Sequence, residues 1–129
     1  FYVTGIPISQ HQSQKIEINF DAEMYGIQME RSVLYERINK RTDVMLNNGM
    51  IDEIEILKAR GYHYKTHNSL NTVGAREIFD FLDGLVTKER MSELIKQNTR
   101  RFAKRQLTWF RRDEKIKWIG KYFEHIGMH

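Results

Sequence analysis

The sequence predicts a mainly α-helical fold with two or three short strands. The chain has 129 residues, enough for one domain with a buried core. From about Arg31 onward, apolar residues recur mostly at helical spacing. The alternation typical of a strand occurs only in three short segments: Lys15–Phe20, Tyr25–Met29 and Lys115–Ile119. Strands so short and so far apart are not expected to form a sheet by themselves, and we interpret them as parts of a sheet whose other strands lie outside this chain.

The first residues suggest that this chain is a fragment. Phe1–Val3 has the character of a helix end, because Thr4-Gly5 and Pro7 follow it. No initiator Met precedes this apolar run. The predicted organisation is one unit, with a helix end and mobile linker in residues 1–14, short strands in 15–29, a helical body in 30–112, and a short strand and tail in 115–129.

The first two helices are bounded by residues that favour left-handed caps. The first runs from about Arg31 to Asn48-Gly49. The second covers Ile51–Arg60, has acids in its first turns and is closed by Gly61. In the loop that follows, His63 and His67 have the spacing of a zinc pair. No acid or further His stands nearby to complete a site, so no metal site is predicted.

A third helix is predicted over Asn71–Leu82, and a fourth starts at Thr87. Asn71 or Thr72 is the expected N-cap of the third helix. Its inward-facing residues are expected to be Ile78, Phe79 and Leu82. A short polar segment carries a glycine at this helix start and consists of Asn71, Thr72, Val73, Gly74, Ala75 and Arg76. Such a segment can lay backbone N–H groups against a phosphate or a base.

Arg41 is the most informative single residue. It falls in the apolar stripe of the first helix formed by Leu34, Ile38 and Met45. A guanidinium on an inward face needs an anionic partner, because an unpaired buried charge is very costly. One reading is an ion pair with an acid such as Glu17 or Asp52. The other is a phosphate or pyrophosphate pocket, which Arg37 one turn earlier slightly favours.

The stretch Asn98–Arg112 combines many bases with no acid. Its basic residues are Arg100, Arg101, Lys104, Arg105, Arg111 and Arg112. On a helix they and Thr108 share an arc of roughly 140°. The opposite face is predicted to be apolar and inward, and it consists of Met91, Ile95, Phe102, Gln106, Trp109 and Phe110. The basic arc is either a solvated surface or a surface that contacts nucleic acid or phosphate.

Composition excludes several classes of function. The absence of cysteine removes disulfides, thiol catalysis and thiolate metal sites. No apolar run approaches the ~20 residues of a membrane span. The sequence also lacks the GxxxxGK[ST], GxGxxG, GxSxG and HExxH motifs.

Taken together, these stretches resemble the tRNA dimethylallyltransferases, also called tRNA isopentenylpyrophosphate transferases. The matching segments run in the family's order: YVTGIPIS (Tyr2–Ser9), LYERINKRTDVMLNNGMIDE (Leu34–Glu53), NTVGAREIFDFLDG (Asn71–Gly84) and TRRFAKRQLTWFRRD (Thr99–Asp113). The last is similar to the specific TRxxAKRQxTWxR signature. The resemblance is to the C-terminal half of such an enzyme, whose core is an α/β fold like that of nucleotide kinases, with a P-loop.

The resemblance implies transfer of a dimethylallyl group from its diphosphate to N6 of the adenosine just 3′ of the anticodon. It implies Mg²⁺ as cofactor, tRNA (through its anticodon stem-loop) and dimethylallyl diphosphate as partners, no membrane, a cytoplasmic location and a monomeric full-length enzyme. The P-loop and the aspartate general base would lie in the N-terminal half. That half would also supply most of the contacts to Mg²⁺. We therefore expect no transfer by this chain alone.

The resemblance also assigns roles to residues. Arg41 corresponds to the family arginine that contacts the diphosphate, which favours the pocket reading given above. The tRNA-contacting residues would be Asn71, Thr72, Val73, Gly74, Ala75, Arg76, Arg101, Lys104, Arg105, Gln106, Thr108, Trp109 and Arg111. The family usually has Tyr where this chain has Ala75, so a stacking or hydroxyl contact is in doubt there. The alternative function is a stand-alone helical module that binds RNA or another polyanion without catalysis.

Overall fold

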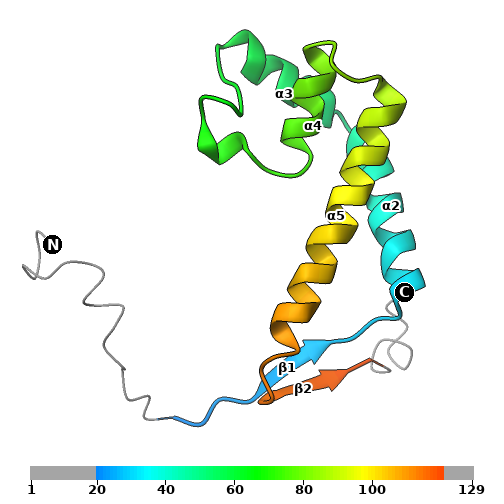
Figure 1. Cartoon of the computed structure of the whole chain (residues 1–129), viewed down its shortest axis with the longest axis vertical. Helices are drawn as coiled ribbons and strands as arrows, with labels where there is room; N and C mark the ends of the chain where they lie inside the picture. Colours follow the sequence, from blue (N-terminus) through cyan, green and yellow to red (C-terminus); the bar gives the residue numbers. More distant parts are fainter. Residues whose placement is uncertain (1–19, 121–129) are drawn as a thin grey trace, which may run out of the picture.

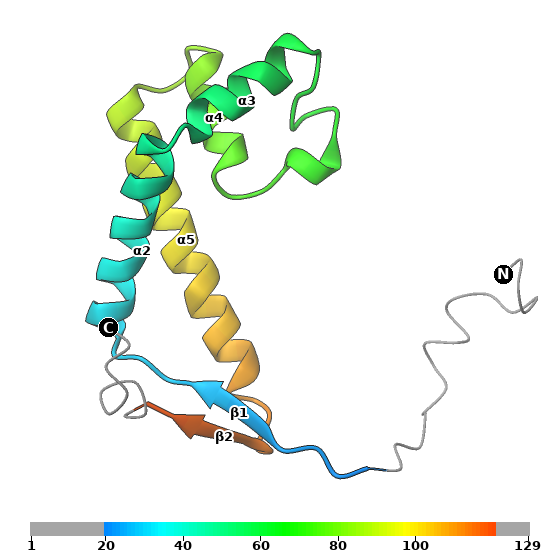
Figure 2. The same cartoon turned by 180° about the vertical axis from the view of Figure 1, so that it is seen from behind.

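The computed structural model describes residues 20–120 and confirms the mainly helical architecture. Helices α2 and α5 lie side by side, with α3 and α4 at one end of this pair and a small sheet at the other (Figures 1 and 2). In chain order the elements are β1 (Met24–Ile27), α2 (Arg31–Asn47), α3 (Met50–Ala59), a 3₁₀ helix η1 (Asn68–Leu70), α4 (Ala75–Leu82), α5 (Lys88–Phe110) and β2 (Ile116–Ile119).

Some predicted segments fall outside the described residues. These are the helix end at Phe1–Val3, the linker to residue 14, the strand Lys15–Phe20 except for Phe20 itself, and the tail from Lys121. None of the helices within residues 20–120 is both long enough and apolar enough to cross a lipid bilayer.

The two described strands pair with each other in parallel. Met24 lies opposite Ile116 and Ile27 opposite Ile119. Both strands were predicted, but the expectation that they would form no sheet by themselves is wrong. Their close pairing depends on Gly26, because a Cβ atom at that position would lie 2.7 Å from the Trp118 ring. Only glycine leaves room for the side chains of Trp118 and Ile116 against β1.

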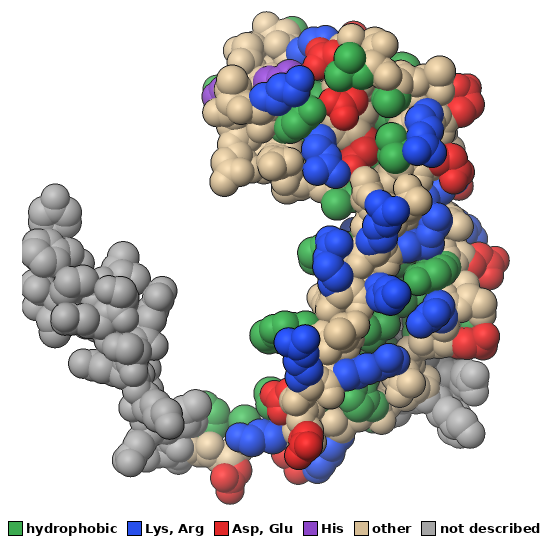
Figure 3. Space-filling view, in the orientation of Figure 1, with side chains coloured by type: hydrophobic (Ala, Val, Ile, Leu, Met, Phe, Trp, Pro, Cys, Tyr) green, Lys and Arg blue, Asp and Glu red, His purple; other side chains and the backbone are tan. Residues whose placement is uncertain are grey.

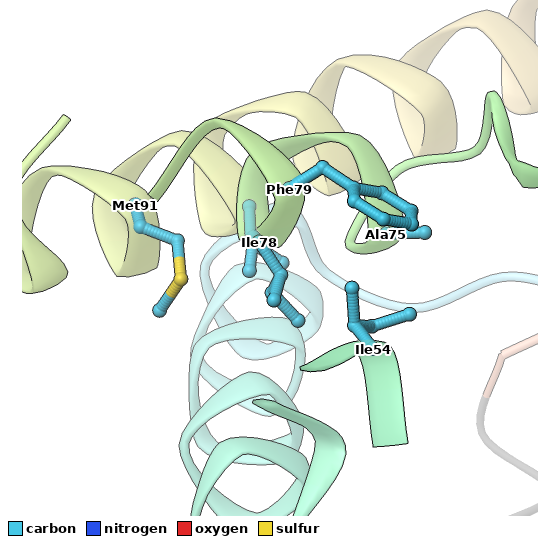
Figure 4. Packing of buried hydrophobic residues seen from close by; sticks show 6 residues of the cluster. Ile54, Ala75, Ile78, Phe79 and Met91 are labelled. Atoms are coloured by element: carbon cyan, nitrogen blue, oxygen red, sulfur yellow. The ribbon is translucent and has the colours of Figure 1, made fainter. Parts of the chain in front are cut away.

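The hydrophobic core lies where α3, α4 and the first half of α5 meet (Figure 4). Its buried members are Ile54, Ala75, Ile78, Phe79, Met91 and Ile95. The inward orientation predicted for Ile78, Phe79, Met91 and Ile95 is confirmed. Leu82 is only partly buried and packs against the edge of this cluster. The core therefore fixes α4 against α5, and it leaves the other half of α5 to other contacts.

The start of α4 differs from its prediction. The N-cap is Gly74 rather than Asn71 or Thr72, and its φ of 102° lies in the region that favours glycine. The Glu77 carboxylate accepts a hydrogen bond of 2.7 Å from the Gly74 N–H. A Cβ at Gly74 would also lie 2.7 Å from the Met50 methyl group. The glycine that is unfavourable inside a helix is therefore required at this turn.

Polar contacts join α2 to α5. Lys96 Nζ lies 2.7 Å from Asp43 Oδ1. Arg100 donates a hydrogen bond of 2.7 Å to Asn39 Oδ1 and lies over the Tyr35 ring, with 5.9 Å between the guanidinium carbon and the ring centroid. These contacts place Arg100 between the two helices, away from the other basic residues of its stretch.

A small polar cluster ties the His63 loop to the end of α4. Asp83 accepts from Lys58 Nζ and from His63 Nε2, each at 2.8 Å. The His63 ring also packs on Phe79, with centroids 4.7 Å apart. The hydrogen bonds from Lys58 and His63 hold the pKa of the Asp83 carboxyl below its ordinary value of 3.8.

Replacing Phe79 by alanine is expected to lower the free energy of unfolding by about 3–5 kcal/mol, because it leaves a cavity in the core. The matched control is Phe102→Ala, since Phe102 is 54% exposed. The control should change stability by less than about 0.5 kcal/mol. Urea denaturation followed by circular dichroism measures both, and equal losses for the two variants would contradict this assignment of the core.

Asp83→Asn is expected to lower the free energy of unfolding at neutral pH by about 1 kcal/mol or less, because Lys58 is partly exposed and screened by solvent. A carboxyl with a lowered folded-state pKa stabilises the fold above its ordinary pKa. This stabilisation is lost as pH falls through the lowered value. The stability difference between the two chains should therefore shrink in acid. A difference independent of pH would exclude the ionised carboxylate as its source.

Candidate nucleic-acid interface

Helix α5 changes its packing partner along its length. Its first half packs on α4 through Met91 and Ile95, and its middle contacts α2 through Lys96 and Arg100. Lys96 directly follows Ile95 and so points about 100° further round the helix. The buried face therefore rotates, and the predicted continuation of the apolar face through Phe102 and Trp109 is wrong. Phe102 is 54% exposed and Trp109 is 67% exposed.

The exposed side of α5 carries an open hollow of about 460 Å³. Figure 3 shows Lys and Arg side chains gathered over the column formed by α2 and α5. The residues that line the hollow are Arg101, Lys104, Arg105, Thr108, Trp109 and Arg112. Four of these six are cations and none is an acid. The hollow thus combines positive charge with one large exposed aromatic ring.

The cations of this hollow keep their charge free for a ligand. Within residues 20–120, no carboxylate forms an ion pair with Arg101, Lys104, Arg105 or Arg112. The guanidinium of Arg105 lies 6.0 Å from the centroid of the Phe102 ring. The Trp109 ring meets Phe110 edge to face at 5.0 Å. Aromatic neighbours therefore support these side chains without neutralising them.

Not every residue predicted to contact RNA lines the hollow. Gln106 and Arg111 are exposed but lie outside its lining. Arg100 is directed towards α2. Arg112 does line the hollow, although it was not among the predicted site residues. Its place in the same basic arc was the signal that could have identified it.

The turn Asn71–Arg76 lies beside the start of the basic stretch. Asn98 Nδ2 donates a hydrogen bond of 2.8 Å to Glu77 Oε1, which directly links α4 to α5. In the turn, Asn71, Thr72 and Val73 are exposed and Arg76 is half-exposed. The structure thus brings together two segments that the sequence places far apart. Glu77 was missed as a candidate, although an acid three residues into a helix is a known capping signal.

Ala75 and Gly74 are the buried members of that turn. The Ala75 side chain is 7% exposed and belongs to the core. This chain therefore offers no aromatic or hydroxyl contact where the family usually has Tyr. Gly74 shapes this turn through its backbone, because it has no side chain.

Arg41 is exposed, so its predicted inward orientation is wrong for the described residues. The buried residue of α2 is its neighbour Thr42, about 100° away around the helix. Within residues 20–120, Arg41 forms no ion pair with Asp52 or any other acid, and Glu17 lies outside them. Arg37 is also exposed and reaches Met29 Sδ at 3.9 Å. Neither arginine lines the α5 hollow.

Potential metal ligands do not cluster in the described part of the chain. Residues 20–120 hold no group of three or more His, Asp or Glu side chains that could bind a metal ion. His63 is engaged with Asp83 instead. The described residues therefore do not fit a Mg²⁺ site by themselves.

Comparison with known proteins gives a consistent result. A family model described as IPP transferase matches residues 1–113. A tRNA dimethylallyltransferase of Christiangramia forsetii is 50% identical over 117 residues, which cover 90% of this chain and 37% of that protein. Another from Flavobacterium johnsoniae is 48% identical over 101 residues, covering 78% of this chain and 31% of that protein.

Solved structures agree with the sequence matches. The tRNA isopentenylpyrophosphate transferase of Bacillus halodurans superposes with a TM-score of 0.72 at 46% identity, over 75% of this chain and 31% of that one. The enzyme of the same name from Staphylococcus epidermidis gives 0.73 at 35% identity, over 90% and 37%. The chain thus spans 31–37% of the length of these relatives. Since the family model matches most of its residues, the chain belongs to the IPP transferase family.

Proposed function

We propose that this chain is part of a tRNA dimethylallyltransferase and supplies tRNA contacts and a diphosphate-binding arginine. The observation that carries the proposal is the hollow on α5, which is lined by Trp109 and by four cations that have no carboxylate partner within residues 20–120. Family membership and the names of the relatives indicate which polyanion this surface meets. The proposed reaction joins N6 of the adenosine 3′ of the anticodon to the allylic carbon. The carbon–oxygen bond to the diphosphate breaks, and N6 gives up a proton to a base outside this chain.

The hollow suits an RNA backbone in chemistry and shape. Arginine presents a planar fork that can meet two phosphate oxygens at once. Exposed aromatic rings among cations are typical of surfaces that bind unpaired nucleotides, because a base can stack while its phosphate is held. The target adenine must leave the helical stack before its N6 can react. Phosphate contacts on both α5 and the Asn71–Arg76 turn would fix the strand around the extruded base.

Arg41 is proposed to contact the departing diphosphate. Its exposure and its lack of an acidic partner among the described residues leave the guanidinium available. As the carbon–oxygen bond breaks, negative charge grows on the oxygen that leaves. A fixed cation there stabilises the transition state more than the ground state. In this proposal Mg²⁺ is bound mainly outside this chain.

In the full-length protein, Arg41→Ala is expected to lower turnover about a hundredfold or more while tRNA binding is kept. The matched control is Lys40→Ala, which removes a neighbouring exposed cation of α2. Single-turnover prenylation and equilibrium binding of the same tRNA measure the two effects. If Arg41→Ala retained turnover, the residue would have no role at the diphosphate. The rival function, an RNA-binding module without catalysis, would then gain support.

Replacing Arg101 and Arg105 together by alanine is expected to weaken tRNA binding and flatten its salt dependence. Each phosphate contact that is lost reduces the number of counterions released on binding. The slope of log affinity against log salt, which is negative, should therefore become shallower by roughly 1.5 for two contacts. The control pair is Arg60→Ala with Lys88→Ala, two exposed cations away from the hollow. An unchanged slope in the Arg101 and Arg105 variant would remove this hollow from the interface.

A further inference from the structure

Glu77 is a buried carboxylate to which nothing above gives a functional role. Its side chain is 3% exposed. Oε2 accepts from the Gly74 N–H at 2.7 Å, and Oε1 accepts from Asn98 Nδ2 at 2.8 Å and from an Arg76 guanidinium nitrogen at 3.2 Å. All the contacts of this carboxylate are therefore with donors.

Stability alone gives little reason to keep a charge at this position. Moving a carboxylate out of water costs several kcal/mol, and its ion pair often only offsets that cost. The carboxylate differs from a glutamine side chain because both of its oxygens accept. A glutamine would accept from Gly74 or from Asn98 and Arg76, but its amide group would face the remaining donors. The charge is thus matched to the three donors together.

These contacts connect two arginines that the proposed function assigns to tRNA. Arg76 touches Glu77 directly. Arg101 donates a long hydrogen bond of 3.4 Å to Asn98 Oδ1, and the Asn98 amide nitrogen donates to Glu77. One side chain therefore connects the turn before α4 to the first cation of the α5 hollow. Each guanidinium uses one nitrogen in this network, and its other nitrogens can still bind phosphate.

We propose that Glu77 is a positioning residue that holds the guanidiniums of Arg76 and Arg101 at a fixed separation for two phosphates of the tRNA. The inference rests on the proposed function. A flexible arginine must lose side-chain freedom when it binds, and this loss weakens affinity. A carboxylate that orders two arginines in advance reduces that loss. Glu77 itself touches neither the substrate nor the reacting atoms.

The test compares Glu77→Gln with the unchanged full-length protein in tRNA prenylation. The KM for tRNA is expected to rise about tenfold, since hydrogen bonds to charged groups are the stronger ones. The KM for dimethylallyl diphosphate and kcat should stay within about twofold. The control is Glu93→Gln, which alters an exposed acid of α5 and should change none of the three. A lower kcat with an unchanged KM for tRNA would show a purely structural role and overturn the inference.

A double-mutant cycle tests whether Glu77 acts through Arg101. Arg101→Ala should raise the KM for tRNA less in the Glu77→Gln background than in the unchanged protein. Additive effects would overturn the inference. If Glu77→Gln fails to fold, Asn98→Ala breaks the same link from the surface of α5 and takes its place in the cycle. If the unchanged full-length protein did not prenylate tRNA, the proposed function would be refuted. If that protein were active and these variants had the same KM for tRNA, only the role of Glu77 would be refuted.

Discussion

The packing of α5 against two successive partners is the constraint on which the rest of the structure depends. Apolar side chains hold its first half on α4, whereas an ion pair and a hydrogen bond hold its middle on α2. Because the partners lie on different sides, the contact face turns along the helix. This rotation removes Phe102 and Trp109 from the interior and places them among the cations. A helix with one constant buried face would have hidden both rings, including the Trp109 ring that lines the α5 hollow.

The two ends of the molecule are stabilised by different physical means. At the α3–α4 end, six buried apolar residues exclude water. Between α2 and the middle of α5, the ion pair and the hydrogen bond are partly exposed, and each contributes little net free energy. We therefore expect stability to be highest around Phe79 and to decrease towards the sheet. The surface proposed to bind tRNA extends along this gradient of local stability. The Asn71–Arg76 turn lies at the more stable end, and Arg112 lies at the less stable end.

Elements could be predicted from the sequence more reliably than the faces they bury. The C-terminal end of α2 was marked by Asn48-Gly49 and the start of α5 by Thr87, because capping depends on neighbouring residues. On α2, Leu34, Ile38 and Met45 are partly buried as predicted, but Thr42 rather than Arg41 is buried with them. Asn39 contacts Arg100, which lies far along the chain. The pairing of Met24 with Ile116 is likewise a long-range contact. Periodicity carries no information about such partners. The same holds for the candidate site. The basic arc could be predicted from the sequence, whereas the contact of Glu77 with Asn98 depends on the packing of α4 against α5.

The parallel pairing of β1 and β2 has a consequence for the order of folding. In the sequence, the four α-helices of residues 20–120 lie between the two strands, so the pairing closes a long loop and carries an entropic cost. The contacts within α3, α4 and the first half of α5 join nearer neighbours in sequence and can form early. Gly26 and Trp118 would then come into contact last. The pairing of the two strands would therefore complete folding and would not nucleate it.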